Sequence, residues 1–509
     1  MSHDGMSDSV MSDNRLSDDR VIVIGSGPCG AFAARQLVAR GIHVTMLDSG
    51  AAAVRGAVLH IAGNTIARLN PTSSLEVERH QVLDDVNTAW FSSLRLGGLS
   101  NYWTGAVPRF APQDFTDGAA ADERFDWPIR YDDLVPYYES CEALIGVTCG
   151  DDFANIPANT RRYTHRPRSD WRALAAAAKP QGFELAPVPL AKGRPNSLLL
   201  RGTEFNSFNT VVKPLRASGH FTLVGGAHVT TINWSSTAGR VESVEYIDRA
   251  TGARTTLPAR AVVVAAGALD SARLLMQSTS ADFPTGLGNT SGMLGAYLHD
   301  HPRLWFPLRL SAPMAAPSHL MYLSRDEYRE DRPLSGASAS IGLRSSRDRL
   351  RTYVSGKVGE LGVQLFGTMI PSEACFLRLT DEPSSAAPNE KKLGISMRYD
   401  GHAQRSLDEA RERVIRLFAA GGITANAVEP LHELMPGTSV HYGGAVRMHR
   451  SPSLGVLDGW CRMHDVRNVA VCDASSFPTG PEKNPTLTAM AISARAADRL
   501  AEDLHANVI

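Results

Sequence analysis

A glycine-rich turn near the start of the chain restricts the possible folds more than any other feature of the sequence. The hexapeptide GSGPCG at 25–30 lies between a β-branched run at 21–24 and a segment of helical character at 31–40, and a second apolar run follows at 44–48. A strand, a turn, a helix and a second strand form a βαβ unit, which is the setting of a dinucleotide-binding turn. The pattern therefore predicts an α/β fold with a parallel sheet at this end of the chain.

The residues of this turn have separate physical roles. Gly25 permits the tight turn, Gly27 lets the backbone approach a pyrophosphate, and Gly30 lets the helix pack closely on the strand. Asp48 ends the second strand, where a carboxylate can accept a hydrogen bond from a ribose hydroxyl. A glycine-rich turn without a ligand is the alternative, and the fingerprint by itself does not separate FAD from NAD.

Length and charge narrow the possible functions. At 509 residues the chain exceeds what one hydrophobic core usually supports, so we expect two or more domains. A formal net charge of −1 leaves no field that would gather polyanions, which argues against a nucleic acid partner. The sequence contains no apolar run that approaches the ~20 residues of a membrane span, so we expect no membrane contact.

The N-terminal tail and the cysteines indicate the compartment. Residues 1–19 are polar and lack the apolar core of a secretory signal, so this tail is predicted to be disordered. Six cysteines are scattered along the chain without a CxxC pair, which is typical of reduced thiols in the cytoplasm. We therefore expect a cytoplasmic protein.

Further strands are predicted far along the chain. The run AVVVAAGALDSARLL from Ala261 enters a helix after Gly267, and NVAVCDAS at 468–475 contains a fourth strand of the same sheet. Between them, 303–400 alternates apolar and polar residues in RLWFPLRL, ASASIGLR, GVQLFGTM and CFLRLT, and an amphipathic helix follows at 404–420. These patterns predict a second α+β domain with a mostly antiparallel sheet, inserted between the third and fourth strands of the first domain.

Two irregular segments are candidates for binding a planar ring. The loop at 95–110 reads RLGGLSNYWTGAVPRF and combines paired glycines, small hydroxyl residues and aromatic residues. A buried structural loop with a core tryptophan is the alternative. The helix that begins in NPTLTAMA has Asn484 at the predicted N-cap and Pro485 at the first helical position. Its N-terminal dipole could stabilise negative charge on a reduced flavin, although helix capping alone would also explain Asn484.

Histidines supply the candidate base. His441 lies in SVHYGGAVRM, and an imidazole that titrates near neutral pH can take the hydroxyl proton of an alcohol as the carbon-bound hydrogen leaves as hydride. A satisfied core or surface histidine is the alternative. His299 and His301 flank Asp300 in LHDHP, which we interpret as a loop with solvated or capping histidines, because a zinc site needs three or four converging ligands. No metal site is predicted.

In this order, the motifs resemble the signature blocks of the glucose-methanol-choline (GMC) oxidoreductases over nearly the whole chain. The matching segments are GSGPCGAFAARQL with LDSG, GGLSNYWTG, ARAVVVAAGALDSARLL, GLGNTSGMLGAYLHDH, HYGGAVRM and GVLDGWCRMHDVRNVAVCDASSFPTGPEKNPTLTAMA. The resemblance implies a Rossmann-like FAD-binding domain assembled from 20–115, 195–302 and 440–507. It also implies a substrate-binding domain assembled from 116–194 and 303–439.

The resemblance also implies roles for individual residues. His441 matches the catalytic histidine of the family, and Asn484 matches the second position of the pair, which is His or Asn in different branches. Thr104 would approach the reactive edge of the flavin, and the backbone of Val229 would read adenine. The complete predicted cofactor-binding set is Gly25, Ser26, Gly27, Pro28, Cys29, Gly30, Asp48, Ser49, Gly97, Gly98, Ser100, Asn101, Tyr102, Trp103, Thr104, Val229, Ala266, Gly267, Asp473, Ala474, Pro485 and Thr486.

Within the family, the loop at 97–110 and the segment RFDWPIRYDDLVPYY are most similar to pyranose oxidases and related sugar and glycoside oxidoreductases. Some of those enzymes attach FAD covalently through a histidine in this loop, and the matching position here is Tyr102. The resemblance therefore implies noncovalent FAD and a sugar or glycoside substrate, among which an aminoglycoside antibiotic intermediate is a candidate.

The implied reaction is hydride transfer from a carbinol carbon to flavin N5, with His441 as the base and Asn484 orienting the substrate oxygen. Electrons would then pass to oxygen, or to a quinone or similar acceptor. A flavin-dependent lyase, a nicotinamide dehydrogenase, a subunit of a membrane-associated dehydrogenase and a nonenzymatic binding module are the alternatives. The sequence does not indicate an oligomeric state.

Overall fold

The computed structural model describes residues 20–51, 79–149, 156–160, 163–191, 205–317, 320–324, 336–342, 356–384, 390–428 and 435–509. The tail at 1–19, which the sequence predicts to be disordered, lies outside these ranges. Within them, no helix combines the length and the apolar character that crossing a bilayer requires.

A parallel five-stranded sheet forms the centre of the first part of the molecule. Its spatial order is β20-β12-β1-β2-β8, and every neighbouring pair is parallel. The strands are β1 (Val21–Ile24), β2 (Val44–Asp48), β8 (Phe221–Gly225), β12 (Ala261–Val264) and β20 (Val469–Val471). The structure confirms the four predicted strands and adds β8, an edge strand whose partly exposed FTLVG sequence gives no continuous buried run.

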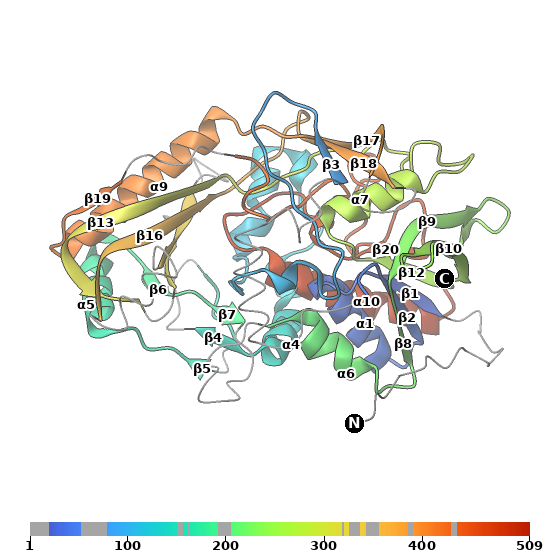
Figure 1. Ribbon diagram of the computed structural model, residues 1–509, viewed down its shortest axis with the longest axis horizontal. Coiled ribbons are helices and arrows are strands. Elements are labelled where there is room, and N and C mark those ends of the chain that lie inside the picture. Colours follow the sequence, from blue (N-terminus) through green and yellow to red (C-terminus); the bar gives the residue numbers. More distant parts are fainter. Residues whose placement is uncertain are drawn as a thin grey trace.

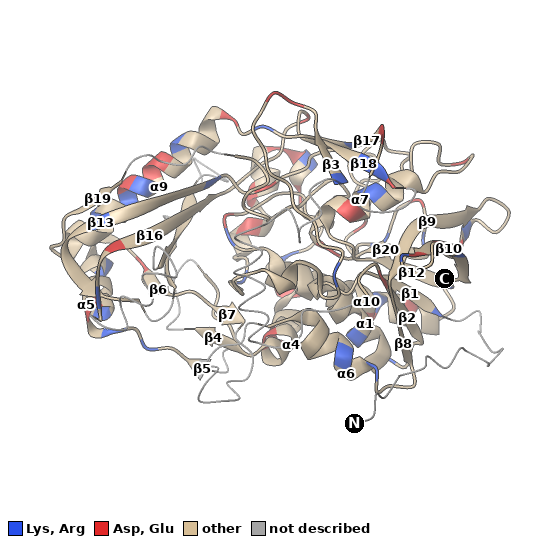
Figure 2. Ribbon diagram, in the orientation of Figure 1, with Lys and Arg blue, Asp and Glu red and all other residues tan. Residues whose placement is uncertain are grey.

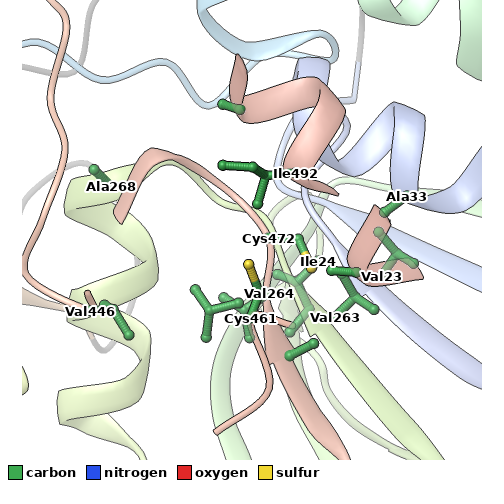
Figure 3. Packing of buried hydrophobic residues seen from close by; sticks show 14 of the residues in the cluster. Val23, Ile24, Ala33, Val263, Val264, Ala268, Val446, Cys461, Cys472 and Ile492 are labelled. Atoms are coloured by element: carbon green, nitrogen blue, oxygen red, sulfur yellow. The ribbon is translucent and has the colours of Figure 1, made fainter. Parts of the chain in front are cut away.

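Two long helices pack against each other beside this sheet (Figure 1). Helix α1 (Pro28–Ala39) starts inside the glycine turn, and α10 (Thr486–His505) is buried along most of its length. Ser493 Oγ of α10 donates to the carbonyl of Cys29 at 2.7 Å. Apolar side chains of both helices, such as Ala33 and Ile492, lie over strand residues such as Val23 and Val263 (Figure 3). Helix α7 (Ala268–Gln277) follows β12, as predicted.

A six-stranded antiparallel sheet forms the second part, with the order β19-β13-β16-β15-β14-β6. Its strands are β6 (Leu185–Pro187), β13 (Arg303–Ala315), β14 (Met321–Leu323), β15 (Ala337–Gly342), β16 (Lys357–Gly367) and β19 (Ala425–Ala427). Helices α5 (Ser169–Ala178) and α9 (Gly401–Ala420) pack against it (Figure 1). The antiparallel sheet expected in the inserted region is thereby confirmed.

Helix α9 begins three residues before the predicted start. Asp400 caps it, because its side chain accepts from the backbone N–H groups of His402 and Ala403 at 3.0 Å. The predicted apolar face is buried, as Leu407 and Leu417 show. Basic and acidic residues follow one another along the helix (Figure 2).

Shorter elements complete the fold. The CFLRLT segment, expected in the antiparallel sheet of the second domain, instead forms β17 (Phe376–Pro383) in a separate sheet with β18 (Lys391–Ser396) and β3 (His80–Val82). Period-two alternation identifies a strand but does not say which strands it pairs with. The remaining strands are β9 (Ala227–Ser235), β10 (Arg240–Asp248), β11 (Arg254–Pro258), β4 (Val147–Cys149), β5 (Tyr163–Thr164) and β7 (Leu190–Ala191), and the remaining helices are α3 (Asp117–Ala121), α4 (Val135–Ile145) and α6 (Lys213–Leu215).

Candidate active site

Four connections meet at the carboxyl edge of the parallel sheet. The glycine turn follows β1, Asp48 ends β2, Gly267 follows β12 and Asp473 follows β20. All four contribute to the wall of one cavity of about 800 Å³. Open parallel sheets bind ligands outside the carboxyl ends of their strands, so the cavity lies where the fold places a ligand.

The glycine turn has the geometry that its sequence predicts. Gly25 has φ +100°, and a Cβ there would lie 2.5 Å from the carbonyl oxygen of Ala265. A Cβ on Gly30 would lie 2.0 Å from the carbonyl oxygen of Gly25. Gly27 differs, since a Cβ there would meet nothing within 4 Å, and its backbone lines the cavity. Gly25 and Gly30 therefore shape the turn, and Gly27 keeps its surface open to a ligand.

Asp48 holds this turn in place. Its two oxygens accept from the backbone N–H groups of Ser26 and Gly50, each at 2.7 Å, and burial raises its pKa. Asp48 also lines the cavity, where a carboxylate oxygen can accept a further hydrogen bond. Both its structural role and the predicted ribose contact fit this position.

A second backbone cradle faces the same cavity. Gly267 has φ +90°, and a Cβ there would meet nothing within 4 Å. Its N–H donates to Asp473 at 3.0 Å, and Asp473 also accepts from Ser271 Oγ at 2.5 Å and from the N–H of Ser475 at 2.9 Å. The two glycine-lined cradles are the feature that fits a dinucleotide, because a Cβ at either position would occupy ligand space.

The loop at 95–104 is bound directly to the glycine turn. The N–H of Gly97 donates to Ser26 Oγ at 2.8 Å, and Trp103 Nε1 donates to the carbonyl of Phe205 at 2.8 Å. Asn101 Nδ2 donates to backbone carbonyls within the loop, including that of Gly98 at 2.8 Å. Gly97 and Asn101 therefore shape the loop.

The structure gathers most of the predicted site residues on the main cavity. These are Gly25, Ser26, Gly27, Pro28, Cys29, Asp48, Gly98, Ser100, Tyr102, Trp103, Thr104, Ala266, Gly267, His441, Asp473, Ala474, Asn484, Pro485 and Thr486. Ser49 and Val229 line a smaller adjoining cavity, of about 80 Å³, that shares Asp48 with the main one. Among the predicted residues, Gly30, Gly97 and Asn101 line neither cavity.

His441 and Asn484 come together on the cavity wall, although they are far apart in the sequence. Asn484 Nδ2 lies 3.0 Å from His441 Nε2. The prediction that Asn484 caps the last helix is wrong: α10 starts at Thr486, Pro485 occupies the N-cap position, and no side chain caps that end. The Asn484 amide is engaged with the imidazole instead. Because an amide nitrogen only donates, Nε2 accepts this hydrogen bond with its one lone pair and carries no proton.

Burial keeps the His441 imidazole neutral. Removal from water, followed by the positive charge of Arg303, lowers the pKa of His441 to about 3. The expectation that this imidazole titrates near neutral pH is therefore wrong. Nδ1 lies 3.3 Å from Nδ1 of His301, whose pKa is also well below its usual value through burial. With Nε2 accepting, the proton of neutral His441 resides on Nδ1 and is donated to His301.

The LHDHP motif is buried, so the prediction of solvated or capping histidines there is wrong. His299, Asp300 and His301 are each at most 1% exposed. Asp300 accepts hydrogen bonds from the backbone N–H groups of Gly437 at 3.0 Å and His441 at 2.8 Å. It also accepts from the backbone N–H and the hydroxyl of Ser439. Burial raises the pKa of Asp300 to about 6. This carboxylate anchors the segment that carries His441, a role that the motif's spacing gave no signal to predict.

Substituting Asp300 with asparagine should test this anchoring role. The amide would replace one acceptor oxygen by a donor that faces N–H groups, and each unsatisfied group costs about 1–3 kcal/mol. We expect a lower midpoint in urea unfolding and slower flavin reduction, with flavin content retained. Wild-type reduction kinetics in the D300N variant would contradict the anchoring role.

One face of the antiparallel sheet completes the cavity. Alternate residues of β13 and β16 line it, namely Arg303, Trp305, Gln364 and Phe366, together with Ser340 of β15. The intervening residues of the same strands, such as Phe306 and Val363, are buried in the apolar core on the sheet's other side. Sequence alternation predicted two faces but could not show which of them borders the cavity.

A glycine turn of the dinucleotide-binding type and a neutral imidazole line one cavity, which is an arrangement expected of an oxidoreductase that uses a dinucleotide cofactor. Two family models, both described as GMC oxidoreductase, match residues 120–303 and 371–493. The chain belongs to the GMC oxidoreductase family. It acts on CH–OH groups, and its cofactor is FAD.

The chain is similar to named enzymes over most of its length. It is 29% identical to the 6'''-hydroxyparomomycin C oxidase of Streptomyces lividus and 29% identical to the paromamine 6'-oxidase of Streptomyces fradiae, in each case over 96% of this chain and 92% of the relative. Among solved structures, pyridoxine 4-oxidase from Mesorbium loti has a TM-score of 0.68 at 17% identity and covers 96% of this chain and 99% of its own. That structure supports the fold.

Proposed function

We propose that this enzyme oxidises a primary or secondary hydroxyl of a sugar or glycoside, with noncovalent FAD as the hydride acceptor and oxygen as the final electron acceptor. The observation that carries the proposal is the His441–Asn484 pair, whose Nε2 and Nδ2 atoms lie 3.0 Å apart on the wall of the cavity that the glycine turn also lines. A base, an orienting amide and a dinucleotide cradle are the parts that alcohol oxidation requires.

The proposed roles follow from the chemistry of each group. A substrate hydroxyl can take the place of the Asn484 amide at His441 Nε2 and give its proton to this atom, because the imidazole is neutral and Nδ1 already carries the ring proton. Asn484 can donate an N–H to the substrate oxygen and thereby orient the carbinol carbon. Asn484 has no basic nitrogen, so proton removal belongs to His441.

Bound FAD supplies the hydride acceptor at N5 of its ring system. The cradles at Gly27 and Gly267 would hold the pyrophosphate, and the start of α10 at Pro485 and Thr486 would face the flavin. Backbone N–H groups at a helix N-terminus favour the negative charge of a reduced ring. Ser49 and Val229, on the smaller cavity, would lie at the adenosine end.

Noncovalent attachment of FAD is supported by Tyr102, which lines the cavity where some sugar oxidases carry the histidine that binds the flavin. Acid precipitation should release the yellow colour into the supernatant. If the colour stays with the pellet after washing, the flavin is covalently bound and this part of the proposal is wrong.

The substrate class is supported by the two relatives named for oxidation of aminoglycoside hydroxyls, which makes an aminoglycoside intermediate one candidate. A panel of monosaccharides, alkyl glycosides and aminoglycosides should be incubated aerobically with the enzyme. We expect one hydrogen peroxide for each aldehyde or ketone formed. Turnover that requires an added quinone would contradict the choice of oxygen, and absence of turnover with every sugar would contradict the substrate class.

We also propose a cytoplasmic location. All six cysteines are free thiols, and five of them are buried. Free thiols persist in a reducing compartment.

A further inference from the structure

Arg303 is a cation on the cavity wall that the reaction described above does not use. It is the first residue of β13, and its Nη1 donates to the carbonyl of Thr438 at 3.1 Å. Its Nε is buried and has no hydrogen-bond partner in the described part of the chain. Within that part, no carboxylate lies within ion-pair distance of this guanidinium, although Asp300 acts on it from farther away. A cation that is partly removed from water and lacks a paired anion is free to serve a ligand.

The described carboxylates that line the cavity are already engaged elsewhere. Asp48 and Asp473 accept backbone N–H groups beside the two glycine cradles. Asp270, on α7, pairs with Arg79 and Arg273 at 2.9 Å and 2.6 Å. These acidic groups therefore lie at the end of the cavity assigned to the nucleotide. The charged group next to a substrate beside His441 is the Arg303 guanidinium.

The wall next to Arg303 suits a sugar ring. Arg303 is paired in register with Phe366, and Trp305 with Gln364, on the cavity-lining face of β13 and β16. Aromatic rings offer apolar faces to the C–H faces of a pyranose, while an amide and a guanidinium bind oxygen atoms. The Thr438 carbonyl that Arg303 binds lies three residues before His441, and both side chains line the cavity, so the guanidinium lies on the same part of the wall as the imidazole.

We propose that Arg303 is a specificity-determining residue that donates hydrogen bonds to a hydroxyl, ring or carboxylate oxygen of the substrate. It thereby selects neutral and acidic sugars over sugars that carry a protonated amine at the position facing it. This inference rests on the proposed sugar oxidation and narrows its substrate class: an aminoglycoside fits only if its amines face away from Arg303. A guanidinium has only N–H donors and a positive charge, so it attracts oxygen acceptors and repels an ammonium group.

The test compares sugars that differ in one substituent. Methyl glucoside, its singly amino-substituted derivatives and the corresponding glucuronide should each be used to reduce the enzyme's flavin anaerobically, and kcat/KM for reduction should be determined for each. For the wild-type enzyme, we expect at least one amino derivative to react about tenfold or more slowly than the neutral glycoside, which corresponds to about 1.4 kcal/mol of repulsion.

Three variants make the comparison specific. R303M removes the charge and should bring the amino and neutral sugars to within about twofold of each other, whereas R303K should retain the preference. R309M is the matched control, because Arg309 lies on the same strand, is largely exposed and pairs with Glu360, and this variant should behave as the wild type does. The readout is a ratio within each variant, so a general loss of activity through the Thr438 contact cancels.

Failure of this inference and failure of the proposed function give different results. If sugars reduce the flavin but R303M keeps the wild-type ratio, or the wild type prefers the amino sugar, then Arg303 does not select the substrate and the proposed oxidation stands. If no sugar in the series reduces the flavin of any variant, the proposed sugar oxidation is wrong and this inference falls with it.

Discussion

Replacing His441 with alanine should slow flavin reduction by a sugar substrate about 10²–10⁴-fold, the usual contribution of a positioned general base. The loss is expected because Nε2 of His441 is the basic atom of the pair, and the Asn484 amide 3.0 Å away has no basic nitrogen that could replace it. Stopped-flow mixing under anaerobic conditions measures the reduction rate directly. Flavin content should match that of the wild type, because His441 contributes a side chain to the substrate end of the cavity.

The pH profile adds a second readout for His441. Its pKa of about 3 means that the imidazole remains neutral as the pH falls well below the ordinary value near 6.5. In the D300N variant, which lacks the carboxyl whose pKa is about 6, flavin reduction should therefore stay level between about pH 8 and pH 5, where an unshifted histidine would already lose its basic form. Substituting the exposed His402 with alanine is the control and should change neither the rate nor the profile. A wild-type rate in H441A would show that another group removes the proton.

Replacing Gly27 with alanine should weaken FAD binding about 10–100-fold without destabilising the apoprotein. Gly27 has φ −58°, which alanine adopts easily, and its added Cβ would meet no protein atom within 4 Å. The methyl group would instead occupy the space needed by the pyrophosphate, and such overpacking costs about 1–3 kcal/mol. Titration of deflavinated protein with FAD, followed by fluorescence quenching, measures the affinity.

Two other glycines provide matched comparisons for G27A. A Cβ on Gly219, which lines neither cavity, also meets nothing within 4 Å, so G219A should retain both stability and FAD affinity. G30A should unfold more readily even without FAD, because its Cβ would lie 2.0 Å from a backbone oxygen. Equal FAD affinity in G27A and wild type would show that the pyrophosphate does not approach this backbone.

The cofactor half of the molecule was predictable because its sequence signals are local. A β-branched run that ends in a glycine turn specifies a strand, a turn and a helix within about 20 residues, and the structure has β1, the turn and α1 in those places. The family resemblance then joined distant segments, such as the one with His441 and the one with Asn484, that no periodicity would connect. Their 3.0 Å contact depends on tertiary packing.

The errors in prediction share one physical cause, which is tertiary contact that the sequence does not encode locally. LHDHP has the composition of a polar loop, yet Asp300 within it is buried and accepts hydrogen bonds from four donors in 437–441. Asn484 has the residue type and position of a helix cap, but a partner from a distant segment competes for its amide. Arg303 could not be singled out either, because alternation does not reveal which face of β13 meets a ligand.

The central claim is that hydride leaves a sugar carbinol carbon for the bound flavin while His441 takes the hydroxyl proton. The most direct test is anaerobic single-turnover reduction by a sugar substrate and by the same sugar deuterated at the oxidised carbon. The account predicts that the flavin is bleached, that one carbonyl product forms for each flavin, and that deuteration slows the bleaching. If the flavin keeps its oxidised spectrum with every sugar and alcohol offered, the protein does not perform this oxidation.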